Sequence, residues 1–281
     1  MIPAEFDYEA PESLEEAIRM LHENGEDAKL LAGGHSLLPL MKLRLAAPTV
    51  LIDLRRIPGL HGIQRDDGVW RVGAMTRHAD LQDNDELGVV SRAASLIADQ
   101  QVRNRGTIGG SLAHGDPASD LPAVMLVSDG EVTARGLSGQ RTIAAADLFQ
   151  DFLTTALEHD EVITEVRLPV LEGYGFGYQK FTRRAEDWAM VGVCALVKKG
   201  ADGSCEDVRI GLTHMGTTPL RATAAEDALR GEALGADSIA RAAEHAAEGT
   251  HPPGDLNASP EYKRHLARTL TGRALMEAAG L

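Results

Sequence analysis

The order of apolar and polar residues over the first 55 positions predicts two strands that flank a glycine turn and a helix. Ser13 and Glu16 form a capping-box pattern that starts an earlier helix, and the pair Gly33-Gly34 separates the first strand from the second helix. The predicted elements are a helix at 13–24, a strand at 28–31, a helix at 37–45 and a strand at 49–54. This βαβ order favours parallel strands and exposes a backbone-lined anion site at the glycine turn.

The middle of the chain alternates between short strand-like and helix-like segments. The predicted elements are a strand at 69–75, helical structure from 76 to 99, a strand at 131–135 and a strand at 161–168. A second glycine pair, Gly109-Gly110, interrupts the chain as a turn. Ser119-Asp120 followed by Pro122 indicates a helix start, because proline is tolerated in the first helical turn.

The last third of the chain changes from strand-like to helix-like patterns. Residues 172–177 contain three glycines and are predicted to be a linker. The elements predicted after it are strands at 178–183, 191–199 and 207–215, and helices near 221–230, 236–248 and 260–278. This part is therefore expected to form a three-stranded antiparallel sheet with a helical layer.

Charge and length narrow the classes of function. The 281 residues suggest about two domains, and the formal net charge is −14. Such acidity argues against a nucleic-acid footprint and against binding to anionic membranes, which leaves small molecules and protein partners. The N-terminus shows no secretory signal pattern, and no apolar run approaches the ~20 residues of a membrane span, so a cytoplasmic protein is expected.

Cysteine content excludes some redox chemistry. Only Cys194 and Cys205 are present, which excludes a disulfide scaffold and an iron–sulfur centre held by this chain alone, since such a centre needs about four thiolates. His78, His114 and Asp116 show no metal-ligand spacing, so no metal site is predicted. Any iron–sulfur chemistry must come from another chain.

The first glycine turn is the leading candidate for a ligand site. Paired glycines let a ligand approach the backbone, successive N–H groups attract anions, and the Ser36 hydroxyl can donate to a pyrophosphate. An ordinary strand-to-helix turn with a capping serine gives the same pattern, so the residues alone leave both interpretations open. His35 in this turn has no recognisable partner for catalysis, and packing or capping is its expected role.

The second candidate is Thr107 to Ser111, with Asp120 nine residues beyond. This turn could clamp the other side of a diphosphate, while the carboxylate accepts hydrogen bonds from sugar hydroxyls. Neither turn matches the Rossmann or Walker patterns. By composition alone, Lys180 is a solvated strand-end charge or a ligand contact, and Trp188 packs in a core or covers a flavin ring.

These motifs resemble one known family. The runs Ala32 to Arg44 and Gln101 to Ser111 are similar to the FAD-binding medium subunit of the molybdenum hydroxylases, the xanthine dehydrogenase family, and most of all to that of aerobic carbon monoxide dehydrogenases. Later motifs at 116–122, 161–169 and 180–184 agree in order and spacing. The resemblance covers nearly the whole chain.

The resemblance implies an α+β fold of the vanillyl-alcohol-oxidase (PCMH) type. Residues 1–175 would form an FAD-binding domain with subdomains of about 1–55 and 56–175, and residues 176–281 a C-terminal domain with a three-stranded sheet and helices. No catalytic residue is expected, because the chain would position and tune FAD.

The resemblance also assigns residues to the cofactor. Residues 32–36 would bind the pyrophosphate, Thr107, Gly110 and Ser111 the diphosphate and ribityl region, and Asp120 a sugar hydroxyl. Ile163 would lie near the adenine or the ring, Lys180 at the flavin's carbonyl edge, and Trp188 against the ring, where related carbon monoxide dehydrogenases have a tyrosine. The full predicted cofactor-binding set is Lys29, Leu31, Ala32, Gly33, Gly34, His35, Ser36, Leu37, Thr107, Gly110, Ser111, Ala113, Asp120, Ile163, Lys180 and Trp188.

The resemblance finally implies partners. Members of the family work with a large molybdenum-cofactor subunit and a small subunit that carries [2Fe–2S] clusters, usually as a dimer of heterotrimers. This chain would pass electrons from the clusters through FAD to an acceptor such as a quinone, in carbon monoxide oxidation or in the hydroxylation of an N-heterocycle or aldehyde. Two alternatives stay open: a free-standing flavin oxidoreductase, and an assembly subunit that has lost FAD.

Overall fold

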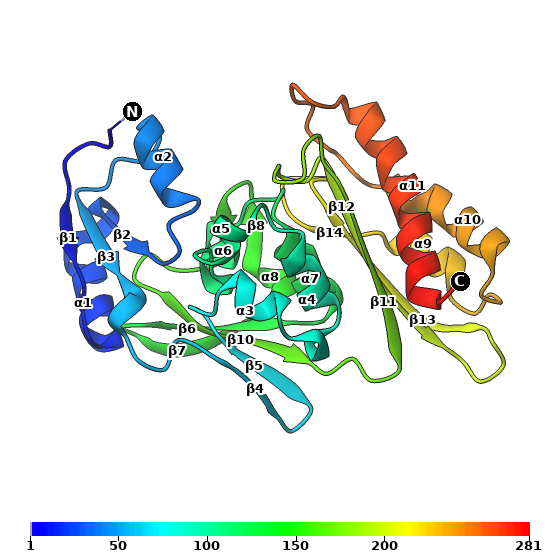
Figure 1. Cartoon of the computed structure of the whole chain (residues 1–281), viewed down its shortest axis with the longest axis horizontal. Helices are drawn as coiled ribbons and strands as arrows, with labels where there is room; N and C mark the ends of the chain where they lie inside the picture. Colours follow the sequence, from blue (N-terminus) through cyan, green and yellow to red (C-terminus); the bar gives the residue numbers. More distant parts are fainter. Residues whose placement is uncertain (1) are drawn as a thin grey trace.

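The computed structural model describes residues 2–281, which form three units in chain order (Figure 1). A small α/β unit lies at one end, a five-stranded sheet with short helices lies in the middle, and a four-stranded sheet with helices lies at the other end. The core of the middle unit extends onto one face of the C-terminal sheet through Tyr178, Cys194 and Leu196. The predicted α+β class is confirmed.

The first unit is a three-stranded parallel sheet with the order β1-β3-β2. Its elements are β1 (Asp7–Glu9), α1 (Leu14–Asn24), β2 (Ala28–Leu31), α2 (Leu37–Leu43) and β3 (Val50–Asp53). The Ser13 hydroxyl accepts a hydrogen bond from the Glu16 N–H, as the capping pattern predicts. Helix α2 ends two residues earlier than expected, because Arg44 adopts a left-handed conformation with φ of 59°.

The second unit is an antiparallel sheet with the strand order β4-β5-β10-β6-β7 and helices packed against it. Its strands are β4 (Ile63–Asp66), β5 (Val69–Gly73), β6 (Glu131–Gly136), β7 (Gly139–Ala144), β8 (Phe149–Asp151), β9 (Thr154–Thr155) and β10 (Val162–Pro169). Its helices are α3 (His78–Gln82), α4 (Val89–Ser95), α5 (Gln100–Arg103), α6 (Ile108–His114), α7 (Asp120–Val127) and α8 (Ala145–Leu148).

Two predictions for this unit are wrong. The expected helical stretch at 76–99 is divided into α3, a 3-10 turn and α4, because Gly88 takes a positive φ of 56° that no continuous helix allows. The pair Gly109-Gly110 is not a turn but lies in the first turn of α6, which Thr107 caps by accepting from the Gly110 N–H.

The third unit is an antiparallel sheet with the strand order β11-β12-β13-β14. Its elements are β11 (Tyr174–Phe181), β12 (Val191–Lys199), β13 (Cys205–Thr213), β14 (Leu220–Arg221), α9 (Thr223–Leu229), α10 (Ala236–Glu244) and α11 (Pro260–Ala279). The sheet therefore has four strands rather than the predicted three. The red helix α11 packs along β11 and β12 (Figure 1).

The predicted linker at 172–177 is also wrong, because most of it belongs to strand β11. Its glycines serve packing. A Cβ atom on Gly175 would lie 2.0 Å from the Ala278 carbonyl oxygen, and one on Gly177 would lie 2.2 Å from that of Ala274. The glycines let helix α11 approach the strand backbone, so a glycine-rich segment that suggests flexibility is instead a close helix-on-strand contact.

A Gly177→Ala variant tests this contact. Because the new methyl group would collide with the backbone of α11, we expect the free energy of unfolding to fall by about 1–3 kcal/mol. The measurement is chemical denaturation of the purified chain. Gly235→Ala is the matched control, since a Cβ there meets nothing within 4 Å. Equal stabilities of the two variants would contradict the packing role of Gly177.

Length and apolar character decide whether a helix can cross a membrane. Among the helices of residues 2–281, none is both long and apolar enough to cross a bilayer.

Candidate cofactor site

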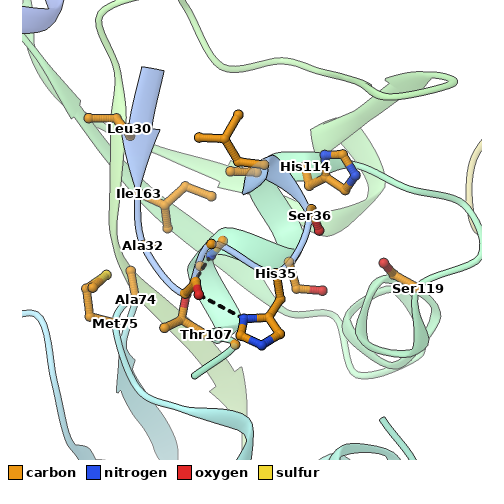
Figure 2. A pocket seen from close by; sticks show the side chains of 18 of the residues that line it. Leu30, Ala32, His35, Ser36, Ala74, Met75, Thr107, His114, Ser119 and Ile163 are labelled. Atoms are coloured by element: carbon orange, nitrogen blue, oxygen red, sulfur yellow. Dashed lines mark hydrogen bonds between the residues drawn. The ribbon is translucent and has the colours of Figure 1, made fainter. Parts of the chain in front are cut away.

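A cavity of about 600 Å³ lies where the first unit, the helices of the middle unit and the start of the C-terminal unit meet. Figure 2 shows Ala32, His35 and Ser36 of the first glycine turn beside Thr107, the residue that caps α6. Fifteen of the sixteen predicted residues line this cavity: Lys29, Ala32, Gly33, Gly34, His35, Ser36, Leu37, Thr107, Gly110, Ser111, Ala113, Asp120, Ile163, Lys180 and Trp188. The exception is Leu31, which is buried beneath the turn with Met41 and Leu51.

The first turn carries a row of free backbone donors. Within residues 2–281, the N–H groups of residues 33–37 have no hydrogen-bond acceptor, although all five residues line the cavity. Successive N–H groups that face one space form a site for an anion, and the start of α2 adds the positive end of its backbone dipoles. The Ser36 hydroxyl stands at the same place and does not cap the helix.

The second segment, Thr107 to Ser111, uses most of its backbone N–H groups within the chain. The N–H groups of Ile108 and Gly109 already donate to the carbonyls of Thr76 and Ala74, and that of Gly110 donates to the Thr107 hydroxyl. The Ser111 N–H donates to the Thr107 carbonyl, so this segment lines the cavity mainly through the hydroxyl of Ser111 and its backbone. Most of the free backbone donors that line the cavity therefore come from the first turn.

A close contact between backbones fixes the two turns relative to one another. A Cβ on Gly33 would lie 2.4 Å from the Arg105 carbonyl oxygen and 2.6 Å from the Gly106 Cα. Gly34, in contrast, has a positive φ of 76°, and its missing side chain would face Leu38 and Leu31 rather than the cavity. The glycine pair thus serves chain-to-chain packing and turn geometry, not only the approach of a ligand.

His35 takes a structural role in this turn. Its Nδ1 lies 2.9 Å from the Gly33 carbonyl oxygen, and the ring is exposed at the rim (Figure 2). The contact closes the turn onto itself. This agrees with the expectation that His35 caps or packs.

Asp120 and Lys180 form a buried ion pair at the cavity wall. The two side chains are 4% and 5% exposed, and the Lys180 Nζ lies 2.9 Å from Asp120 Oδ2. Asp120 Oδ1 accepts from the Tyr178 hydroxyl at 2.6 Å, and Lys180 also donates to the Leu96 carbonyl. Burial raises the pKa of Asp120, while Lys180 and Tyr178 oppose that rise.

This arrangement corrects one expectation. Lys180 is not a solvated strand-end charge, because its ammonium pairs with Asp120 in the protein interior. Asp120 engages both oxygens with residues of strand β11 and thereby joins α7 to the C-terminal sheet. Both residues also line the cavity, so the contacts that the resemblance implies for them, with the flavin's carbonyl edge and with a sugar hydroxyl, stay predictions. The pair thus sets the relative position of two walls of the cavity.

Trp188 lies on the loop between β11 and β12, at the mouth of the cavity. Its side chain is 54% exposed, which excludes core packing within this chain. Glu186 and Asp187 on the same loop also line the cavity. An indole ring that is exposed at a cavity is free to cover a planar ligand.

His78 is a cavity residue that sequence reasoning did not assign to the cofactor. It begins α3, is 5% exposed, and its Nδ1 has no hydrogen-bond partner within the described chain. Burial lowers the pKa of His78 to about 4, so the ring is neutral at physiological pH. Its only sequence signal is a histidine ahead of an apolar helix, which is common in ordinary cores.

The His78 pKa predicts how stability depends on pH. Because the folded pKa lies below the unfolded value of 6.5, the unfolded chain takes up the proton first, and stability is lost as the pH falls from about 6.5 to 4. A His78→Leu variant should lose about 2 kcal/mol less than the wild type between pH 7 and pH 5. Urea denaturation at the two pH values measures this difference. If the free energy of unfolding of His78→Leu changed between pH 7 and pH 5 as much as that of the wild type, the assignment to His78 would be contradicted. His61→Leu, at an exposed histidine, is the matched control variant.

The residues present fit an FAD cofactor. The free N–H groups at 33–37 match the charge of a pyrophosphate, and the exposed Trp188 on the wall of the same cavity matches a flat ring. The hydroxyls of Ser36 and Ser111 also line the cavity and are available as hydrogen-bond partners.

Comparison with known proteins gives the family. The family described as "FAD binding domain in molybdopterin dehydrogenase" matches residues 4–171, and "CO dehydrogenase flavoprotein C-terminal domain" matches residues 176–278. The chain is 42% identical over 280 residues to the carbon monoxide dehydrogenase medium chain of Hydrogenophaga pseudoflava, and the alignment covers 98% of this chain and 97% of that one. It is 40% identical over 283 residues to subunit alpha of the 6-hydroxypseudooxynicotine dehydrogenase complex of Paenarthrobacter nicotinovorans, covering 99% and 96%.

The three-dimensional likeness agrees with these matches. The carbon monoxide dehydrogenase structure from Hydrogenophaga pseudoflava, determined without the Mo-pyranopterin moiety of its cofactor, superposes with a TM-score of 0.96 at 43% identity, over 100% of this chain and 99% of that one. Sequence and fold thus identify the same family along the whole chain. The chain therefore belongs to the molybdenum hydroxylase family, as the FAD-binding medium subunit of a carbon monoxide dehydrogenase-like oxidoreductase.

Proposed function

We propose that this subunit relays electrons from the [2Fe–2S] clusters of a small partner subunit, through its FAD, to an external acceptor such as a quinone. The observation that carries the proposal is the row of unpaired N–H groups at residues 33–37 in a cavity that Trp188 also lines. FAD, when bound, supplies the redox chemistry. The chain itself binds and orients the cofactor. Its two cysteines, Cys194 and Cys205, are both buried on strands of one sheet, and two thiolates are too few for an iron–sulfur centre, so we assign the clusters to the partner subunit.

The proposal assigns parts of the cavity to parts of the cofactor. Residues 33–37 would donate to the pyrophosphate, and Thr107, Gly110 and Ser111 would line the ribityl region. Ile163 and Lys29 would lie toward the adenine, and Ala113 and Trp188 would border the ring. We also propose the domain division predicted above, with an FAD-binding part at 1–175, subdivided near 55, and a C-terminal part at 176–281.

The substrate of the whole enzyme is proposed to be carbon monoxide. The medium chain of a carbon monoxide dehydrogenase is 42% identical to this chain, which supports that assignment. The same role in an N-heterocycle or aldehyde hydroxylase is the second candidate, because a subunit of a 6-hydroxypseudooxynicotine dehydrogenase complex is 40% identical, nearly as similar. A subunit that only relays electrons does not itself select the substrate.

Purification of the native complex tests the relay. Mass spectrometry under native and then denaturing conditions should find FAD together with a molybdenum-cofactor large subunit and a [2Fe–2S] small subunit, with the mass of a dimer of heterotrimers. Carbon monoxide and an N-heterocycle should then be added separately under anaerobic conditions. Only the substrate of the enzyme should bleach the flavin absorbance, and we expect this to be carbon monoxide. A lone chain that carries FAD would instead favour a free-standing flavoenzyme.

Tryptophan fluorescence tests the place of the ring. If the flavin lies against Trp188, its emission should be quenched in the holo-complex and recover when flavin is removed. Trp188→Phe should lack that recovery, because the other tryptophan, Trp70, is buried against Arg65 and does not line the cavity. Subtracting the recovery of the variant from that of the wild type removes the emission of tryptophans in partner subunits. Equal recovery in both would contradict the contact.

A further inference from the structure

One residue, His214, holds together two loops that border the cavity. It follows β13 directly and takes a left-handed conformation with φ of 62°, which is uncommon for a residue other than glycine. Its backbone N–H donates to the Pro117 carbonyl at 2.9 Å, and its ring Nδ1 lies 2.8 Å from the Ala189 carbonyl. Pro117 precedes Ser119 by two residues, and Ala189 follows Trp188. Both Ser119 and Trp188 line the cavity.

A buried lysine determines the direction of the ring's hydrogen bond. Lys263 on α11 is fully buried, and its Nζ lies 3.3 Å from His214 Nε2 and 2.7 Å from Asp255 Oδ2. A lysine ammonium can only donate, so His214 Nε2 must accept. The ring proton therefore resides on Nδ1, which donates to the Ala189 carbonyl. Burial and the charge of Lys263 also lower the pKa of His214, which keeps the ring neutral.

We propose that His214 is a positioning residue that holds the 182–190 loop, and with it Trp188, against the 115–119 loop of the FAD-binding part. Lys263 and Asp255 act through His214 by fixing its tautomer. The contact lies outside the cavity and touches neither turn of the cofactor site. We call the contacts of His214 with Pro117 and Ala189 the clasp. That the 182–190 loop borders the flavin ring rests on the proposed function, whereas the clasp itself rests on the distances just described.

Hydrogen–deuterium exchange of the complete purified complex tests the clasp. In His214→Ala, peptides that cover residues 182–190 should exchange about fivefold faster than in the wild type, the effect expected for one lost net hydrogen bond. Leu270→Ala is the matched control, because Leu270 is buried in the hydrophobic core of the same domain and lies seven residues, about two helical turns, beyond Lys263 on α11. Faster exchange that is equal in His214→Ala and Leu270→Ala would overturn the proposal, since it would reflect only a destabilised domain.

Rescue by a conservative variant separates the clasp from simple packing. In His214→Asn, the amide nitrogen takes the place of Nδ1, and asparagine tolerates the left-handed backbone, so exchange at 182–190 should return close to the wild-type rate. Lys263→Met, which leaves the ring free to change tautomer, should give a rate between wild type and His214→Ala. Failure of asparagine to slow the exchange would overturn the role of the Nδ1–H donor.

The circular dichroism of the flavin in the same samples separates this proposal from the FAD placement. Faster loop exchange with an altered visible signal supports both the clasp and the ring beside Trp188. Faster exchange with an unchanged signal supports the clasp and contradicts the place given to the ring. Unchanged exchange overturns the clasp, whatever the flavin signal does.

Discussion

A Gly33→Ala variant is expected to bind FAD about 10- to 100-fold more weakly than the wild type while its chain remains folded. The added methyl group would stand 2.4 Å from the Arg105 carbonyl oxygen and 2.6 Å from the Gly106 Cα, both of which are backbone atoms. Since no side-chain rotation can relieve this clash, the first turn must move away from the start of α6. The free N–H groups at 33–37 are then displaced relative to the residues of α6 that line the same cavity.

The ratio of FAD to protein after exhaustive dialysis, followed by titration with FAD, measures this loss. Gly272→Ala is the matched control, because a Cβ there meets only the Ala243 methyl group at 3.7 Å, an ordinary contact. Thermal unfolding should show that both variants are folded. Wild-type affinity in Gly33→Ala would mean that FAD binding does not need this approach of the two backbones.

The second large effect is expected for Asp120→Asn. This change leaves the ammonium of Lys180 without a counter-charge in a site where both side chains are about 95% buried, and the free energy of unfolding should fall by about 3 kcal/mol. The loss should be accompanied by weaker FAD binding, because the pair joins α7 to β11 at the cavity wall. Chemical denaturation and FAD titration of the same preparation measure the two effects.

An exposed ion pair provides the comparison. Asp129 pairs with Arg209 in another contact between the middle and C-terminal units, but its side chain is 62% exposed. Asp129→Asn should therefore cost no more than about 1 kcal/mol and leave FAD affinity unchanged. If the two asparagine variants were equally stable, burial of the Asp120–Lys180 pair would not be what joins the units.

Local sequence signals were sufficient for much of the chain. The capping serine at position 13, the proline that opens the last helix at 260 and the apolar run at 191–199 are all signals within a few residues, and the helices and strand they predict are present. Glycine signals were less secure. Gly109 and Gly177 predict a turn and a linker, but they lie inside a helix and a strand because another backbone packs against each of them.

The sequence by itself determined the family, the α+β class and fifteen of the residues that line the cavity, because those depend on motifs that can be recognised from their order and spacing along the chain. Only the tertiary structure decided what several of them do. Lys180 is paired with Asp120, which lies 60 positions away in sequence, and the amides of Ile108 and Gly109 are occupied because the carbonyls of Thr76 and Ala74 reach them. Such partners come from distant segments, and no local pattern records whether a charge or an N–H group will meet one.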